Sequence, residues 1–466
     1  MNENVQNMVG RGIHEKASSV PRSRTGPSTG DWQDLVFRRS AAEATDEMQR
    51  RQKKVKTGCT ETSTTSRMFT VVIRHVQELE TLRSTWAELA QDAVDPNVYY
   101  EPWMLLPALR YLHSSRGLVF LLMFSLDPKH PTVPPLLCGM FPFERQTHYR
   151  GLPCRVLRSL RPKYNRLCTP LVHREFVAEC VTALINWLEQ SPDSCPLVEF
   201  RFIAGEGRFA QELHQQITER RLMAFQSECT VRALFKPMSS GESYLERALK
   251  GKRRKEFRRL ENRLSEAGRI EYRCLDPKGD AKPWITSFLE LESRGWKGEM
   301  GSSLASQEDA RRFFEESAQE AHRHGQLMML GLFHENKAIA LKCNFVSGHG
   351  SFAFKIAFDE EYGRYSPGML LEMENVRRLH TMPEVAWMDS TADAQHFMIN
   401  RLWIDRRTVE TLVVSVNRPP GGLIVAGLPL LRWIKGTVHH VLDGKGWGRF
   451  KGNSLRGRTN HEQRNW

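Results

Sequence analysis

Hydrophobic residues along the chain follow two periods, one of two residues and one of 3.6 residues. The first period is typical of strands and the second of helices that bury one face. From Phe69 to about residue 238, this pattern predicts a series of strands and helices that begins and ends with a strand. The predicted strands are 69–73, 118–124, 136–143, 155–160, 168–172, 197–203 and 229–234, and the predicted helices are 76–92, 99–112, 175–188 and 208–221.

The second half of the chain repeats much of this order. Three strands follow one another closely and are joined by the turns 335–337 and 347–350, so that we predict an antiparallel meander. The predicted strands are 270–275, 327–333, 338–346, 350–358, 385–388 and 409–416, and the predicted helices are 284–296, 307–324 and 367–380.

The similar element order predicts an α+β (mixed α/β) protein with two tandem domains of one fold, each a mixed, largely antiparallel sheet flanked by helices. We place the first domain at residues 68–238 and the second at 239–416. Residues 1–67 carry few large apolar side chains and are predicted to be a disordered leader. Residues 417–466 form a basic, Pro- and Gly-rich C-terminal extension with a short apolar helix near 428–434.

The junction between strand 350–358 and helix 367–380 has the features of an anion site. Ser366 is a suitable N-cap, and Pro367 suits the first helical position, where its missing N–H costs nothing. The free N–H groups of Gly368, Met369 and Leu370 would then point out of the helix start, and Arg364 adds a positive charge. A plain capped junction without a ligand is the alternative interpretation. The candidate donor-binding residues are Arg364, Ser366, Gly368, Met369 and Leu370.

A basic amphipathic helix is predicted within residues 239–268. Seven of the ten residues from Lys250 to Arg259 are basic, while apolar residues keep a helical stripe through the segment. A patch of one charge sign raises the local concentration of anions. Almost no aromatic residues stand between the charges, which disfavours a surface that stacks on nucleic-acid bases. A solvated charged face is the alternative.

Composition supports anionic partners and places the chain in a reducing compartment. The 466 residues carry a formal net charge of +13, and the nine cysteines form no C-x-x-C pair. No stretch reaches the roughly 18 apolar residues of a membrane-spanning helix, and the N-terminus lacks the apolar core of a secretory signal. We therefore expect a cytoplasmic protein. There is no G-x-S-x-G, Walker A or H-E-x-x-H motif, and no metal site is implied.

The run from the basic helix to Asp389 resembles the CelD/BcsL-type acetyltransferase family of the GNAT superfamily, which is related to the FemAB transferases. The basic segment 252–268 resembles the helix that precedes the family's domain. The segment from Ala357 to Leu371 follows its A-F-D-x-x-[FY]-x-x-x-S-P-G-x-L-L pattern, and Asp389 matches the aspartate that closes the next strand. The residues after Asp389 depart from the family's glycine/glutamate and tyrosine-lysine pattern, so the acceptor and the catalytic group cannot be transferred by analogy.

The resemblance implies an N-acyltransferase, with acetyl-CoA or another acyl-CoA as co-substrate. The expected acceptor is an amine of an amino sugar or of another cell-envelope or polysaccharide precursor. Acyl transfer to an amine needs a proton acceptor and a stabilised oxyanion. The candidate catalytic residues are Asp389, His396 and Glu290, with Glu292 as a further possible base, and the candidate substrate-binding residues are Trp296 and Lys297, beside Arg294.

Two functions of other classes remain open. A FemAB-like aminoacyl-tRNA-dependent transferase would use the basic helix to hold RNA. A non-catalytic GNAT-like protein would use the same surface to bind a partner or a membrane face. Apart from tRNA, we expect no nucleic-acid partner, and the sequence does not predict an oligomeric state.

Overall fold

The computed structural model describes residues 67–114, 116–126, 133–416 and 418–446, with the backbone alone at Arg67, Trp296, Lys297 and 434–446. The predicted disordered leader lies outside the described residues, except for Arg67. The fold class is confirmed, because a large and mostly antiparallel sheet is flanked by helices.

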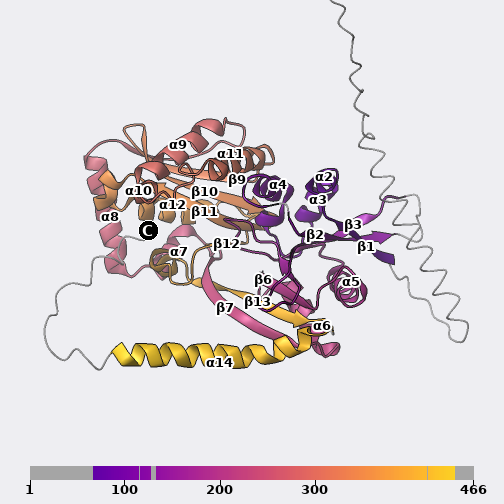
Figure 1. The fold of residues 1–466 in the computed structure, drawn as a ribbon. Coiled ribbons are helices and arrows are strands. Elements are labelled where there is room, and N and C mark those ends of the chain that lie inside the picture. The colour runs from indigo at the N-terminus through magenta and orange to yellow at the C-terminus, as the bar shows by residue number, and fades with distance from the viewer. Residues whose placement is uncertain (1–66, 115, 127–132, 417, 447–466) are drawn as a thin grey trace, which may run out of the picture. The chain divides into compact units, whose positions relative to one another are not determined.

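A single thirteen-stranded sheet runs through the described part of the chain (Figure 1). Its order is β1-β2-β3-β4-β6-β13-β7-β12-β11-β10-β9-β8, and β5 pairs with β3. Strands β9, β10 and β11 are antiparallel neighbours, which confirms the predicted meander. The bounds are β1 Arg67–Ile73, β2 Leu118–Leu126, β3 Leu136–Gln146, β4 Val156–Ser159, β5 Leu171–Val172, β6 Leu197–Ala204, β7 Ala224–Phe235, β8 Ile270–Cys274, β9 Leu327–His334, β10 Lys337–Ser347, β11 Gly350–Phe358, β12 Trp387–Asp389 and β13 Asp405–Ser415.

Helices cover both faces of the sheet and define three main cores. One core lies between α5, α6 and the first-half strands. Helices α4, α9 and α11 pack on one face of the meander, and α7, α8, α12 and α13 pack on the other. The bounds are α2 Val76–Glu80, α3 Arg83–Gln91, α4 Pro102–Tyr111, α5 Val177–Gln190, α6 Arg208–Glu219, α7 Gly241–Ala248, α8 Gly251–Glu266, α9 Lys282–Arg294, α10 Trp296–Glu299, α11 Glu308–Arg323, α12 Pro367–Leu379, α13 Phe397–Leu402 and α14 Gly421–Gly446, with the 3₁₀ helices η1 Val98–Tyr100 and η2 Glu360–Tyr365.

The two halves of the chain exchange their last strands. In the first half β4 runs parallel to β6, and in the second half β11 runs parallel to β12. The strand that completes the first-half sheet beside β6 is β13, from the end of the second half. The strand beside β12 is β7, from the end of the first half. Because β7 and β13 also pair with each other, the two halves share one hydrogen-bonded sheet.

Several predicted elements differ from the observed ones at their breaks and ends. The segment 76–92 forms two helices, α2 and α3, and the predicted basic helix 239–268 forms α7 and α8. The break falls at Leu249, whose backbone is extended (φ −113°, ψ 123°) and whose side chain is buried. Strand β7 and helix α14 are longer than predicted. The domain boundaries at 238 and 416 remain a prediction.

Candidate active site

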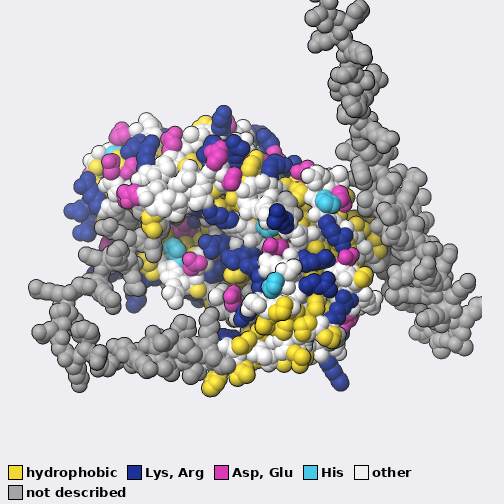
Figure 2. Space-filling model, viewed as in Figure 1, with side chains coloured by type: hydrophobic (Ala, Val, Ile, Leu, Met, Phe, Trp, Pro, Cys, Tyr) yellow, Lys and Arg dark blue, Asp and Glu magenta, His cyan; other side chains and the backbone are white. Residues whose placement is uncertain are grey.

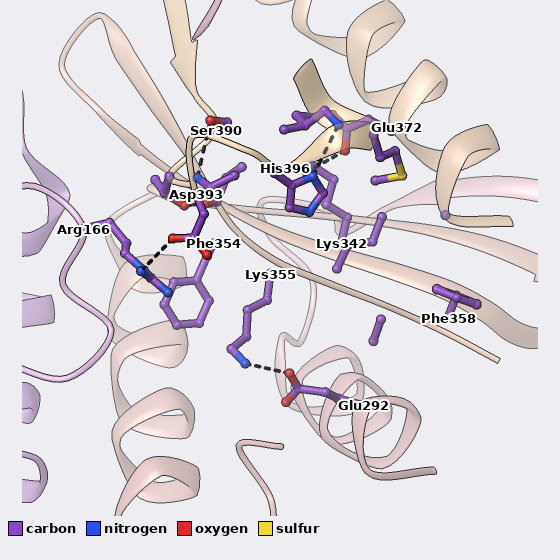
Figure 3. Close-up of a pocket in the computed structure, with 18 of the residues that line it drawn as sticks. Arg166, Glu292, Lys342, Phe354, Lys355, Phe358, Glu372, Ser390, Asp393 and His396 are labelled. Atoms are coloured by element: carbon purple, nitrogen blue, oxygen red, sulfur yellow. Dashed lines mark hydrogen bonds and ion pairs between the residues drawn. The ribbon is translucent and has the colours of Figure 1, made fainter. Parts of the chain in front are cut away.

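A cavity of about 450 Å³ lies where the parallel strands β11 and β12 separate (Figure 3). The two strands pair only from Gly350 to Phe352 on β11. Beyond that point residues 353–358 line one wall, and residues 390–393, after β12, line another. Along this stretch β11 pairs with β10, and the Ala353 carbonyl accepts a hydrogen bond from the Thr391 hydroxyl. The remaining lining residues are Tyr99, Tyr164, Arg166, Leu291, Glu292, Gly295, Lys342, Glu360, Gly368, Glu372, His396, Met398 and Ile399.

The start of α12 reaches this cavity through Gly368. The expectation that three consecutive N–H groups are free there is wrong for two of them, because those of Met369 and Leu370 donate to the Ser366 carbonyl at 3.0 and 3.1 Å. Ser366 stands at the N-cap position, but its backbone is left-handed (φ 54°) and its side chain makes no capping hydrogen bond. Within the described residues, the Gly368 N–H has no such partner, and it remains the donor that the helix start presents to a ligand.

A buried polar network forms the floor between β10 and α12. The ammonium of Lys342 lies 2.8 Å from Oε2 of Glu372, and both side chains are almost fully buried. Asn375 donates to the other oxygen of Glu372 at 3.0 Å, and Asn344 donates to Asn375 at 3.0 Å. A buried charge pair needs such extra hydrogen bonds to offset its desolvation, so this network fixes the Glu372 carboxylate in one position.

His396 lies beside this ion pair and lines the cavity (Figure 3). It is the N-cap of α13, and its Nδ1 accepts the Ile399 N–H at 3.4 Å. Burial lowers the pKa of His396, and the charge of Lys342 acts in the same direction, while the charge of Glu372 opposes them. A neutral imidazole whose Nδ1 is an acceptor carries its proton on Nε2. In this arrangement His396 is therefore a hydrogen-bond donor through Nε2.

Two further ion pairs stand in the cavity wall. Lys355 lies 2.7 Å from Oε1 of Glu292, whose Oε2 accepts the Leu304 N–H at 2.8 Å. Arg166 lies 3.6 Å from Asp393, whose side chain is largely exposed. Cationic and anionic groups therefore alternate around the cavity, which suits a ligand that carries both kinds of charge.

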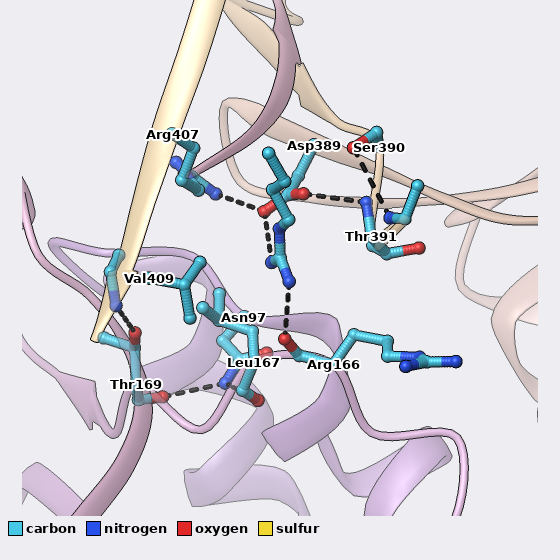
Figure 4. A network of polar contacts seen from close by, with 12 residues as sticks. Asn97, Arg166, Leu167, Thr169, Asp389, Ser390, Thr391, Arg407 and Val409 are labelled. Atoms are coloured by element: carbon cyan, nitrogen blue, oxygen red, sulfur yellow. Dashed lines mark hydrogen bonds and ion pairs between the residues drawn. The ribbon is translucent and has the colours of Figure 1, made fainter. Parts of the chain in front are cut away.

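Asp389 does not line the cavity. It is fully buried at the end of β12, and its Oδ2 lies 2.6 Å from Arg232 on β7 and 2.9 Å from Arg407 on β13 (Figure 4). Its Oδ1 accepts the Thr391 N–H at 2.8 Å. Although burial favours the neutral acid, the two guanidinium groups lower the pKa of Asp389 below its usual value. A carboxylate held in this way is a weak proton acceptor.

Two other predicted site residues, Glu290 and Arg364, do not line the cavity. Glu290 is exposed on α9 and faces Arg294 at 3.6 Å, and Arg364 is exposed, with its guanidinium 4.8 Å from the Tyr365 ring centre. The side chains of Trp296 and Lys297 lie outside the description, and only their place in α10 is given. Of the predicted residues, the cavity brings together Gly368, His396 and Glu292.

Sequence reasoning missed the residues that carry most of the charge in this cavity. Lys342 and Asn344 alternate with apolar residues in the middle of a predicted meander strand, and Glu372 and Asn375 stand three residues apart on the apolar face of α12. Polar residues at positions that should be buried signal a functional or paired group. Lys342 and Glu372 were detectable by this signal.

The described part of the chain lacks two kinds of feature. It contains no group of three or more His, Cys, Asp or Glu residues placed to hold a metal ion. Across the same residues, no helix combines the length and the apolar character needed to cross a bilayer.

Comparisons with known proteins bear on the second half of the chain. Residues 251–397 match the family model described as acetyltransferase (GNAT) domain. No curated protein matches the chain.

Solved structures resemble the chain at low identity. FemX has a TM-score of 0.48 at 9% identity, with 74% of this chain and 98% of that chain covered. The C-terminal domain of a putative lysylphosphatidylglycerol synthetase from Agrobacterium fabrum has 0.43 at 14%, covering 75% and 96%. A conserved protein of unknown function from Bacteroides thetaiotaomicron has 0.44 at 12%, covering 72% and 96%. The family match begins at α8 and ends just after His396, so the part of the chain that is similar to a GNAT acetyltransferase domain contains most of the cavity wall.

Proposed function

We propose that this protein is an N-acyltransferase that binds an acyl-CoA in the cavity between β11 and β12. The observation that carries the proposal is the position of the cavity, between the diverging strands β11 and β12 and the start of α12. The phosphates of a donor in this cavity can meet the Gly368 N–H at the positive end of the helix. The match of this region to the GNAT domain supports the same donor class.

The charged groups of the cavity suit transfer to an amine. A cationic amine is attracted by Asp393 at the exposed side of the cavity and by the carboxylates deeper inside. The Nε2–H of His396 is available to stabilise the oxyanion of a tetrahedral intermediate through a hydrogen bond, and the proton that the attacking amine releases can pass to the leaving thiolate. Glu372 and Lys342 hold the surroundings of this ring in place. An amino sugar or another envelope or polysaccharide precursor as acceptor is supported by the CelD/BcsL resemblance.

Two substitutions of Gly368 test the donor site. Its missing Cβ would meet only Phe358 and Ile356, at 3.5 and 3.8 Å, so Gly368→Ala fits without displacing a neighbour. Gly368→Asp places a carboxylate at the helix start, where it favours the helix but repels phosphate. Isothermal titration with acetyl-CoA should show binding in wild type and Gly368→Ala, and about tenfold or greater weakening in Gly368→Asp, for a cost of about 1.4 kcal/mol. Equal affinity in all three would contradict the donor site.

A second candidate is a transferase that takes its acyl group from aminoacyl-tRNA. The surface of α8 favours it, because Lys252, Arg253 and Lys255 are exposed while Phe257 and Leu264 anchor the helix. Helix α8 also contacts η2, the segment that leads into α12. Binding of charged tRNA with a steep salt dependence, together with absent acetyl-CoA binding, would favour this candidate.

A further inference from the structure

The outer face of α14 forms an apolar surface on the described part of the chain. The inner face of the helix packs through Val425 and Leu428 into a small core with Tyr149 and Val413. The outer face instead exposes large side chains, and Figure 2 shows hydrophobic atoms gathered over this region. Their exposed fractions are 81% for Leu423, 59% for Leu430, 52% for Leu431 and 67% for Trp433.

Neighbouring segments extend this surface beyond the helix. Met223 is exposed, and its sulfur lies 3.3 Å from where a Cβ at Gly422, at the start of α14, would stand. Leu152 is exposed in the turn beside Tyr149, which belongs to the same small core. Single exposed apolar residues are ordinary, but a contiguous group of this kind on one side of a molecule marks a surface that meets another apolar phase. We name these six residues the α14 surface: Leu152, Met223, Leu423, Leu430, Leu431 and Trp433.

Three arginines stand on the chain segments that form the α14 surface. Arg150 lies over the Tyr149 ring at 5.5 Å and is exposed, Arg155 follows the buried Cys154 of the same core, and Arg432 is exposed on the helix itself. Glu199 is buried and paired with Arg158 at 2.8 Å, so these two charges offset each other. Lys and Arg side chains lie beside the hydrophobic patch in Figure 2. The chain as a whole carries a charge of +13.

We infer that the α14 surface docks on an anionic lipid bilayer, with α14 lying in the plane of the interface. Entry of leucine and tryptophan side chains into the boundary between headgroups and acyl chains lowers the free energy. Arginines at the same depth pair with anionic headgroups. A second copy of this chain is the less suitable occupant. A symmetric pairing through the α14 surface would bring the same arginines of both copies together, whereas a bilayer of anionic lipids neutralises them. The inference is independent of the acyl donor and of the acceptor.

The test is co-sedimentation of the full chain with vesicles. One set contains phosphatidylcholine alone, and the other an equimolar mixture of phosphatidylcholine and phosphatidylglycerol. We expect binding to the mixed vesicles and much weaker binding to the neutral ones. Leu430→Ser combined with Leu431→Ser should weaken binding about tenfold or more, since losing the burial of even one leucine is worth about that factor. Met300→Ser is the matched control, because Met300 is exposed to 69% outside the α14 surface and should bind like wild type.

Two further measurements separate the alternatives. Arg150→Gln combined with Arg432→Gln should reduce the preference for phosphatidylglycerol while leaving the fold intact, because both side chains are exposed. Sedimentation-velocity measurements without lipid should give the same mass for wild type and for the leucine variant. Unchanged vesicle binding in the leucine variant, equal binding to both vesicle sets, or a wild-type dimer that the leucine variant dissociates would each overturn the inference.

Discussion

Asp389 joins three strands of the shared sheet through a single carboxylate. It stands on β12, while its partners Arg232 and Arg407 stand on the exchanged strands β7 and β13. Arg232 also donates to the Arg166 carbonyl at 2.8 Å, which ties this network to the cavity wall (Figure 4). At this position the residue holds the sheet in the register that shapes the cavity.

We predict that Asp389→Ala lowers the free energy of unfolding by about 3–5 kcal/mol, because it leaves two buried guanidinium groups without their partner. The pKa of Asp389 is lowered on folding, so its stabilisation is present above its unfolded pKa and is lost as the pH falls through the folded value. Urea denaturation followed by circular dichroism measures the change. Asp393→Ala is the control, since that side chain is largely exposed. Wild-type stability of Asp389→Ala together with lost turnover would instead favour a catalytic role.

Glu101 is a buried carboxyl group with a different pH dependence. Burial raises its pKa to about 7, although Trp103 and Gln326 both donate to its Oε2 at 2.7 Å. Above the ordinary value of 4.5 the unfolded chain has released this proton while the folded chain still holds it. Stability therefore falls as the pH rises between these two values, by about 3 kcal/mol in total.

Glu101→Gln should remove this part of the pH dependence, because an amide does not titrate and keeps an acceptor for the same donors. We expect the variant to gain stability relative to wild type between about pH 5 and about pH 8. Thermal unfolding at both pH values gives the comparison, and the difference between the two proteins cancels the contribution of the other carboxylates. A constant difference at both pH values would argue against a titrating Glu101.

At the scale of elements, hydrophobic periodicity predicted those helices and strands whose bounds depend on the local sequence alone. The meander and α12 lie close to their predicted bounds, because their apolar residues repeat with the right period and their ends carry turn or capping residues. The break at Leu249 was missed, since the same apolar side chain continues the helical stripe on either side. The partners of β7 and β13 were missed because strand pairing over about 180 residues leaves no mark on a local pattern.

The same distinction between local features and tertiary packing applies to the residues of the candidate site. Gly368 and His396 could be proposed from the sequence, because a helix start and a titratable residue are local features. The Lys342–Glu372 pair depends on the packing of α12 against β10, which only the tertiary structure defines. Asp389 matches the family pattern. Its place in the sequence does not reveal that two arginines from distant strands pair with it.

At the scale of the whole molecule, the exchanged strands couple the two halves. Strand β13 supplies the neighbour of β6, and β7 supplies the neighbour of β12, so neither half can open its sheet alone. We predict one cooperative unfolding transition for residues 67–416. Urea denaturation followed separately by tryptophan fluorescence and by far-ultraviolet circular dichroism should give coincident curves. Two separated transitions would mean that each half is stable without the other's strand.

The strand exchange also has a consequence for biosynthesis. A ribosome releases the first half of this chain, from β1 to β7, well before β13 has been translated. During that interval β6 lacks its neighbour and presents an open edge of apolar residues, the kind of edge that pairs with other nascent chains. Co-translational folding of the first half therefore stays incomplete until residue 415 has left the exit tunnel, and chaperone binding to nascent chains should persist to that length.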